Sequence, residues 1–279
     1  MSQTYDRAED VLRYCAGHAD AALVVLRDVT GGTLRAKGAM MAVTKGQVAG
    51  YISNGCIDAD VIARARGGQS GTFIYGEGSP YRDISLPCGG RLEITIIQKP
   101  DMAAVQTALA GLERRELTQL NLGNFSISLS PRISLRIAGR GEACLALADY
   151  AKLSGFEVRV QSPDADILPD VQHLTRPDEP PEADDDARTA MVCLFHDHDW
   201  EAALLQQALA GPAFYIGAMG SVRTHEIRCE TLSKLGVSQA DIARIHAPIG
   251  LIASQRDAQL LAISILAEII QTAQKAELI

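Results

Sequence analysis

The sequence lacks the features that mark membrane, secreted and nucleic-acid-binding proteins. No run approaches the roughly 18 consecutive apolar residues of a membrane-spanning helix, and residues 1–20 have no apolar stretch of the signal-peptide kind. Lys and Arg number 26 against 34 Asp and Glu, a formal net charge of −8, so the electrostatic footprint of a nucleic-acid binder is also missing. We expect a cytoplasmic protein with no membrane or nucleic-acid partner.

Cysteine pairs of the CxxC type are missing as well. The six cysteines are widely separated, which argues against structural zinc, and a disulfide scaffold is not expected in a chain of this length. We therefore expect free thiols. The six are Cys15, Cys56, Cys88, Cys144, Cys193 and Cys229.

What is present fits a globular α/β protein of two domains. At about 150 residues per domain, 279 residues suffice for two, and 47% hydrophobic residues allow an ordinary core. Residues 1–99 predict a small N-terminal α+β domain, with helices at 8–19 and 57–66 and strands at 21–28, 39–44, 71–75 and 91–98. Residues 100–132 are expected to form the linker, with helical spacing in 99–120 and a strand or arm at 123–130.

The second half has the strand–helix–strand pattern of a parallel sheet, so we expect a Rossmann-like domain over 133–279. The segment 178–186 (DEPPEADDD) is predicted to be a solvated loop, because its like charges and prolines resist packing. The predicted strands lie at 134–138, 155–160, 191–195 and 213–216, and the helices at 141–154, 199–210 and 257–276.

The turn Gly139-Arg140-Gly141 comes after a strand and opens a helix. Glycines there let the backbone approach a ligand, and the helix N-terminus favours a phosphate. A nicotinamide site is disfavoured because Cys144 holds the third small position and Gln161 stands where an acid would bind the ribose. The alternative is a tight turn without a ligand.

Two earlier turns carry cysteine. Cys56 precedes a predicted helix, and the amides of its turn could bind an anion. A thiol at a helix N-terminus tends towards a lowered pKa and soft-metal ligand character. Cys88 lies in a second glycine-rich turn. The alternative is a buried small residue or an ordinary loop. The candidate residues are Ser53, Gly55, Cys56, Asp58, Cys88, Gly89 and Gly90.

Three later turns follow predicted strands, and ligands of open α/β sheets bind beyond the carboxyl ends of strands. Backbone amides near Ser221 together with Arg223 could hold a phosphate. The alternatives are helix capping by Asp197 or Asp199 and a structural role for His246. The candidate residues are His196, Gly217, Gly220, Ser221, Arg223 and His246.

Taken together, these motifs resemble the XdhC/CoxI family, accessory proteins of molybdenum hydroxylases such as xanthine dehydrogenase. The resemblance covers most of the chain, and its segments follow in the family's order. They are VAGYISNGCIDADV (48–61), LPCGGRLEI (86–94), IAGRGEACLALADYAKLSGFEVRV (137–160), FHDHDWE (195–201), YIGAMGS (215–221), IHAPIGL (245–251) and AISILAEII (262–270).

The resemblance implies a protein that binds the molybdenum cofactor, supports its sulfuration by a cysteine desulfurase and delivers it to an apo molybdenum hydroxylase. It further implies a homodimer, no catalytic residue, and Cys56 and Cys88 as candidate thiols beside molybdenum. The sequence departs from the family pattern at Asn54, Asp58, Gln161, Thr224 and Leu260.

Two other hypotheses remain open from the sequence. One is an NAD(P)-dependent oxidoreductase that uses the Gly139–Gly141 turn, and the other is a scaffold that binds a hydroxylase without any cofactor. The chaperone hypothesis requires that the cysteine turns of the first half and the glycine turns of the second half converge on one ligand.

Overall fold

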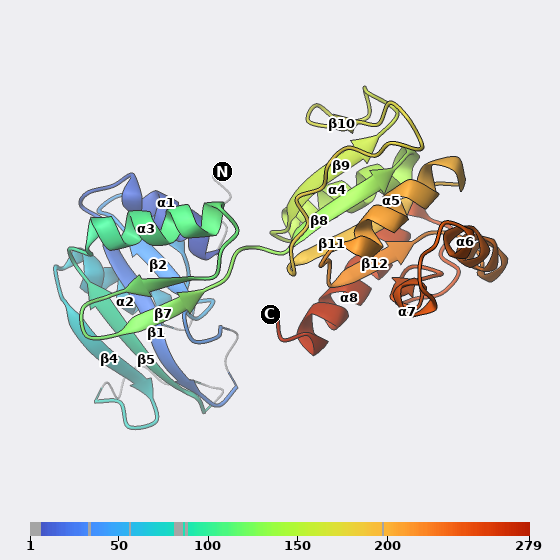
Figure 1. Cartoon of the computed structure of the whole chain (residues 1–279). Coiled ribbons are helices and arrows are strands. Elements are labelled where there is room, and N and C mark those ends of the chain that lie inside the picture. The colour runs from blue at the N-terminus through green and yellow to red at the C-terminus, as the bar shows by residue number, and fades with distance from the viewer. Residues whose placement is uncertain (1–6, 33–34, 56, 81–85, 87–88, 197) are drawn as a thin grey trace. The chain divides into compact units, whose positions relative to one another are not determined.

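The computed structural model describes residues 7–32, 35–55, 57–80, 86, 89–196 and 198–279. The chain forms two compact units, Met1–Pro131 and Arg132–Ile279 (Figure 1). In the described part of the chain, no helix is both long and apolar enough to cross a membrane.

The first unit is built on a five-stranded antiparallel sheet of order β3-β2-β1-β5-β4, with a separate β6–β7 hairpin. Its elements are α1 (Ala8–Ala16), β1 (Ala22–Thr30), β2 (Met40–Val43), β3 (Val48–Gly50), α2 (Asp58–Arg66), β4 (Gly71–Gly76), β5 (Arg91–Ile97), α3 (Met102–Glu113), β6 (Thr118–Asn121) and β7 (Ser126–Leu129).

Both faces of this sheet are covered, which explains why β1 reads as a continuous apolar run. Side chains alternate between faces along a strand. Leu23 and Val25 join the core beneath α1 and α3, whereas Val24 and Leu26 join the core beneath α2. The predicted strands and helices of residues 8–97 are therefore present with slightly shifted ends.

The segment 100–132 was expected to form the linker, and its α3, β6 and β7 belong to the first unit, which ends at Pro131. The helical spacing buries Val105 and Leu112 against α1, and the alternating strand pairs as a hairpin that buries Leu120 and Ile127 in the same core. This segment is folded because its apolar face has a partner within its own unit. The units divide between Pro131 and Arg132.

The second unit holds a six-stranded parallel sheet of order β10-β9-β8-β11-β12-β13, which confirms the predicted parallel sheet. Its elements are β8 (Ser134–Gly139), α4 (Gly141–Leu153), β9 (Glu157–Ser162), β10 (Gln172–His173), β11 (Thr189–Leu194), α5 (His198–Ala210), β12 (Tyr215–Ala218), α6 (Val222–Lys234), α7 (Gln239–Ile242), β13 (Ile245–His246) and α8 (Ala258–Lys275).

Helices α4 and α8 pack on one face of this sheet, and α5 packs with α6 on the other (Figure 1). From β8 the chain winds outwards to β9 and β10, whereas from β11 it winds the other way to β12 and β13. The strand order therefore reverses between β8 and β11. The crevice beyond the carboxyl ends of two such strands is the usual ligand site of open α/β sheets.

Candidate functional site

The structure brings the predicted turns of the second unit to one edge of the sheet. Gly139 ends β8 and pairs with Leu194 of β11, after which the chain reaches His196. Gly217 in β12 pairs with His246, which ends β13. All strands run parallel, so these residues lie at the carboxyl edge.

The two glycines of the first turn have different roles. A Cβ on Gly139 would lie 2.8 Å from Leu194 Cβ and 2.9 Å from its carbonyl oxygen, so this glycine is required by the neighbouring strand. Gly141 has a φ of +71°, and no heavy atom lies within 4 Å of where its Cβ would be. The side chain of the N-cap residue Arg140 makes no capping hydrogen bond. Gly141 is therefore not required by packing, because a Cβ there would meet no neighbour.

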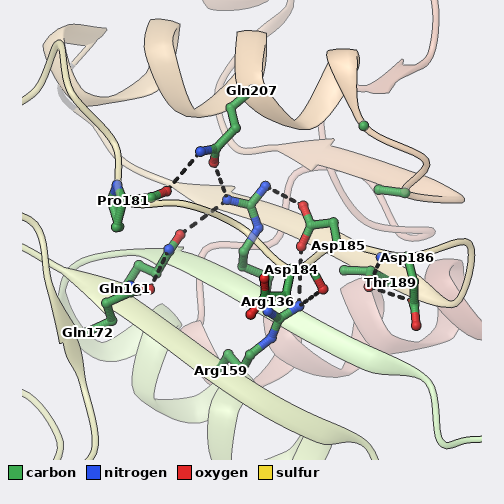
Figure 2. A network of polar contacts seen from close by, with 12 residues as sticks. Arg136, Arg159, Gln161, Gln172, Pro181, Asp184, Asp185, Asp186, Thr189 and Gln207 are labelled. Carbon is green, nitrogen blue, oxygen red and sulfur yellow. Dashed lines mark hydrogen bonds and ion pairs between the residues drawn. The ribbon is translucent and has the colours of Figure 1, made fainter. Parts of the chain in front are cut away.

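Gln161, the position expected to carry an acid in a dinucleotide site, is turned inwards (Figure 2). It is buried at the end of β9, where its Oε1 accepts a hydrogen bond from Arg136 Nη1 at 3.4 Å. Its Nε2 donates to Gln172 Oε1 at 2.8 Å. Both ends of the amide are thus engaged within the protein.

Arg136 itself is a buried charge in the middle of β8. Its side chain is 1% exposed, and Nη2 lies 2.6 Å from Asp185 Oδ2. Burial lowers the pKa of Arg136, and the charge of Asp185 opposes that shift. Nη1 also donates to Gln207 Oε1 on α5 at 2.9 Å, and Arg159 Nη2 contacts Asp185 Oδ1 at 3.2 Å (Figure 2).

This network corrects the prediction that 178–186 is only a solvated loop. The side chain of Asp185 is 5% exposed. A buried guanidinium requires a counter-charge with good geometry, and the acidic segment supplies it. Asp178 and Glu179 remain exposed, as predicted for a run of like charges.

The loop that follows β12 is fixed by a second buried ion pair. Arg228 of α6 donates to both oxygens of Glu201 on α5, at 3.1 and 2.9 Å, and to Met219 O at 2.6 Å. The Ser221 hydroxyl caps α6 by accepting from Thr224 N at 3.1 Å. Gly220 has a φ of +135°, which residues with side chains rarely adopt, and a Cβ there would lie 2.7 Å from Thr224 Cγ2.

A third cluster surrounds His246. Its Nδ1 lies 3.3 Å from Glu268 Oε1, while Tyr215 Oη and Gly250 N donate to Glu268 Oε2, each at 2.7 Å. Burial alone would raise the pKa of Glu268, but these hydrogen bonds hold it below the ordinary value. Gly217 leaves the room that the cluster needs, because its Cβ would lie 2.7 Å from Tyr215 Oη.

The cysteine turns of the first unit are only partly described. Asp58 is central to the first of them: its Oδ1 accepts from the amides of Ile52 and Ser53 at 3.0 Å each, and its Oδ2 accepts from Gly55 N at 2.6 Å. The Ser53 hydroxyl accepts from Ile57 N at 3.0 Å. These amides, expected to bind an anion, are therefore satisfied within the loop itself.

Cys56 and Cys88 lie outside the described residues, so their convergence with the turns of the second unit remains a prediction. In the second cysteine turn, Gly89 is exposed with a φ of +66°, and Gly90 is buried. A Cβ on Gly31 would lie 3.0 Å from Gly90 Cα, so two backbone segments meet closely here.

Comparisons with known proteins give the family. The family model described as the XdhC Rossmann domain matches residues 135–269, and the one described as the XdhC and CoxI family matches residues 15–76. The molybdenum cofactor insertion chaperone PaoD of Escherichia coli K12 is 32% identical over 274 residues, covering 89% of this chain and 82% of PaoD. The chain belongs to the XdhC and CoxI family.

Each family match falls within one of the two units, and the resemblance inferred from the motifs is confirmed. A second relative, the uncharacterized E. coli K12 protein YqeB, is 28% identical over 155 residues, covering 53% of this chain and 28% of YqeB. A Bacillus halodurans structure described as a xanthine dehydrogenase has a TM-score of 0.73 at 19% identity, covering 96% of both chains. It confirms the fold class of this XdhC family member.

Proposed function

We propose that the chain binds the molybdenum cofactor and serves in its insertion into a molybdenum hydroxylase. The observation that carries the proposal is the 32% identity to an insertion chaperone over 89% of the chain. We expect binding and transfer without turnover.

The residues at the carboxyl edge of the second sheet suit the phosphate-bearing end of the cofactor. The N-cap residue of α4 makes no side-chain capping hydrogen bond, and the first amides of this helix of 13 residues favour an anion. Arg140 and Arg223 are exposed at this edge and can pair with phosphate oxygens. His196, which follows β11, is also exposed.

The other end of the cofactor needs soft ligands. When bound, the group supplies a molybdenum atom held by dithiolene sulfurs, and thiolates are the protein ligands that match it. In the described residues, no group of three or more His, Cys, Asp and Glu is placed to hold a metal ion. We propose Cys56 and Cys88 as the thiols beside molybdenum, with Asp58 holding the amides that precede Cys56.

The partners follow from the same proposal. A chaperone of this kind requires an apo molybdenum hydroxylase as acceptor, and we propose a cysteine desulfurase as the source of the sulfur added to molybdenum. We further propose a cytoplasmic homodimer. Size-exclusion chromatography with light scattering tests the oligomeric state, and a monomer at micromolar concentration would contradict the dimer.

An NAD(P)-dependent oxidoreductase gains no support from the geometry. The ribose of a dinucleotide is normally held by a carboxylate after the second strand, and Gln161 at that place is buried with both amide ends engaged. Titration with NADH and NADPH checks this, and tight saturable binding would contradict it.

The decisive experiment is retention of the molybdenum cofactor by the full chain. Purified protein is mixed with the released cofactor under anaerobic conditions, and molybdenum is measured in the protein peak after gel filtration. We expect near-stoichiometric retention and transfer to an apo-hydroxylase, followed by the return of hydroxylase activity. Absence of retention rules out the proposal.

The thiol assignment needs its own variants. Cys56→Ala and Cys88→Ala should each weaken molybdenum retention, whereas Cys229→Ala removes a thiol of α6 and should not. Thermal unfolding of all three shows whether the fold is intact. If the Cys56 variant retained as much molybdenum as the Cys229 variant, Cys56 would not be a thiol beside molybdenum.

A further inference from the structure

The edge of the sheet where the strand order reverses carries an arginine and the chain's one tryptophan. Arg140 follows β8, and Trp200 lies in the first turn of α5, which follows β11. The guanidinium carbon of Arg140 is 5.8 Å from the centre of the Trp200 ring. This cation–π contact joins the two turns between which ligands of open α/β sheets bind.

Arg140 is anchored at its base and open at its tip. Its amide donates to Leu194 O at 3.4 Å, and its Nε lies 3.3 Å from Asp164 Oδ1 beyond β9. The side chain is 42% exposed. Among the described residues, Nη1 and Nη2 of Arg140 have no hydrogen-bond partner, so two guanidinium nitrogens are available to an oxyanion.

Trp200 is held firmly in place. Its ring stacks on the buried Phe195, with centres 6.2 Å apart and planes 18° from parallel. The next residue, Glu201, is buried in the ion pair with Arg228, which fixes the first turn of α5. Trp200 is partly exposed. A partly exposed aromatic residue that is held in place is suited to stacking on a flat ring.

We propose that Arg140 and Trp200 bind the phosphorylated pterin of the cofactor, the indole stacking on the ring system and the guanidinium pairing with the phosphate. This rests on the proposed function and names the residues that recognise the organic part of the ligand. Binding replaces the Arg140–Trp200 contact by contacts to the ligand. Gly141 follows Arg140 at the start of α4, where no side chain caps the helix, and the phosphate would also approach the first amides of α4.

Trp200 also provides the readout, because its emission is that of a single tryptophan. The probe is 6-hydroxymethylpterin monophosphate, titrated into the full chain with correction for absorbance by the pterin. We expect saturable quenching of the indole emission. Unphosphorylated 6-hydroxymethylpterin should bind about tenfold more weakly, the loss of one charge-assisted contact worth about 1.4 kcal/mol. Inorganic phosphate alone should leave the emission unchanged.

Variants separate the two contacts. Arg140→Ala should lower affinity for the phosphorylated probe about tenfold and leave affinity for the unphosphorylated pterin unchanged. Trp200→Ala should lower the affinity for both pterins, and Trp200→Phe should retain part of it. Because these two variants lack the indole, their binding is measured by equilibrium dialysis with the pterin's own fluorescence. Arg176→Ala is the matched control, because Arg176 is an exposed arginine, 61% accessible, of the same unit.

The outcomes distinguish this proposal from the proposed function. Molybdenum retention without quenching, or quenching to which Arg140→Ala makes no difference, overturns the Arg140–Trp200 assignment and leaves the chaperone function standing. Loss of molybdenum retention in the unmodified chain overturns the proposed function itself. The assignment is supported if Arg140→Ala lowers the affinity for the phosphorylated pterin alone and Arg176→Ala changes neither affinity.

Discussion

Tyr215 Oη donates a hydrogen bond to Glu268 Oε2 at 2.7 Å, and this bond joins the sheet to the last helix beneath His246. The phenol is buried, and the carboxylate is 17% exposed. Glu268 is a single acid among the apolar residues of α8, and three donors converge on it. The pair therefore fixes the turn between β13 and α8.

Removing the phenol oxygen should weaken this arrangement. Tyr215→Phe keeps the ring but leaves Glu268 with one donor fewer, so we expect a loss of about 1–2 kcal/mol in the free energy of unfolding. Urea unfolding measures it. Tyr150→Phe on α4, a partly buried tyrosine of the same core, serves as control. Equal stability of the Tyr215 variant and the unmodified chain would contradict the role assigned to the bond.

The same cluster predicts an acid dependence of stability. The pKa of Glu268 is lower in the folded protein than its ordinary value of 4.5, so the folded state favours the carboxylate. Its contribution is complete above about pH 4.5 and is lost as the pH falls through the folded-state pKa. Glu268→Gln should flatten the decline of the unfolding free energy below that pH. If the unfolding free energy of the variant declined with falling pH as steeply as that of the unmodified chain, the role assigned to Glu268 would be contradicted.

Buried thiols predict the behaviour at alkaline pH. Burial raises the pKa of Cys15 to about 11 and that of Cys144 to about 12, from 9.0. Because the folded-state pKa values are raised, these groups stabilise the fold below pH 9, and their contribution is lost as the pH rises towards those values.

The burial of these thiols also predicts their reactivity. In peptide mapping after alkylation at pH 8, Cys229 should be modified in the folded protein well before Cys15 and Cys144. Rapid modification of Cys144 would contradict its burial.

The ion pair between Arg136 and Asp185 should be costly to break from one side. Asp185→Ala leaves a buried guanidinium without its counter-charge, and we expect a loss of about 3–5 kcal/mol. Asp178→Ala removes an acid of the same segment whose side chain is 72% exposed, and it should change stability little. Thermal or urea unfolding compares the two. Similar small effects would show that the acidic segment is merely solvated.

Gly217 should not tolerate a side chain, because its Cβ position is crowded. A Cβ would lie 2.5 Å from Ile249 Cδ1 and 2.7 Å from Tyr215 Oη, so Gly217→Ala should destabilise by about 1–3 kcal/mol through overpacking. Gly217→Ala combined with Ile249→Val should recover part of the loss. A neutral effect of the single substitution would contradict this packing role.

Patterns in the sequence predicted most of the elements, and the reason is physical. The strands 134–139 and 189–194 are buried along their whole length, which produces apolar runs. The helix Val222–Lys234 was missed because Arg228 and Leu232 are its only buried residues, so it has almost no apolar stripe. The short strands β3, β10 and β13, of two or three residues, are too brief to show a period.

The site could be predicted only in outline. That several turns meet at one edge follows from the βαβ pattern, since carboxyl ends of parallel strands share an edge. Which glycine packs and which faces open space depends on neighbours far along the chain, as with Gly139 against Leu194. The partners of Arg136 and Glu268 are likewise set by tertiary contacts, although a charge within an apolar strand or helix was a usable signal.

The inward-facing amide at the end of β9 has a consequence for protein engineering. Installing an acid at that place, the usual first step towards a dinucleotide-dependent enzyme, would put a new carboxylate within reach of Arg136, whose Nη1 already bonds to Gln161. The new anion would turn towards that cation instead of outwards to a sugar. Redesign of this scaffold for redox chemistry would first have to replace Arg136.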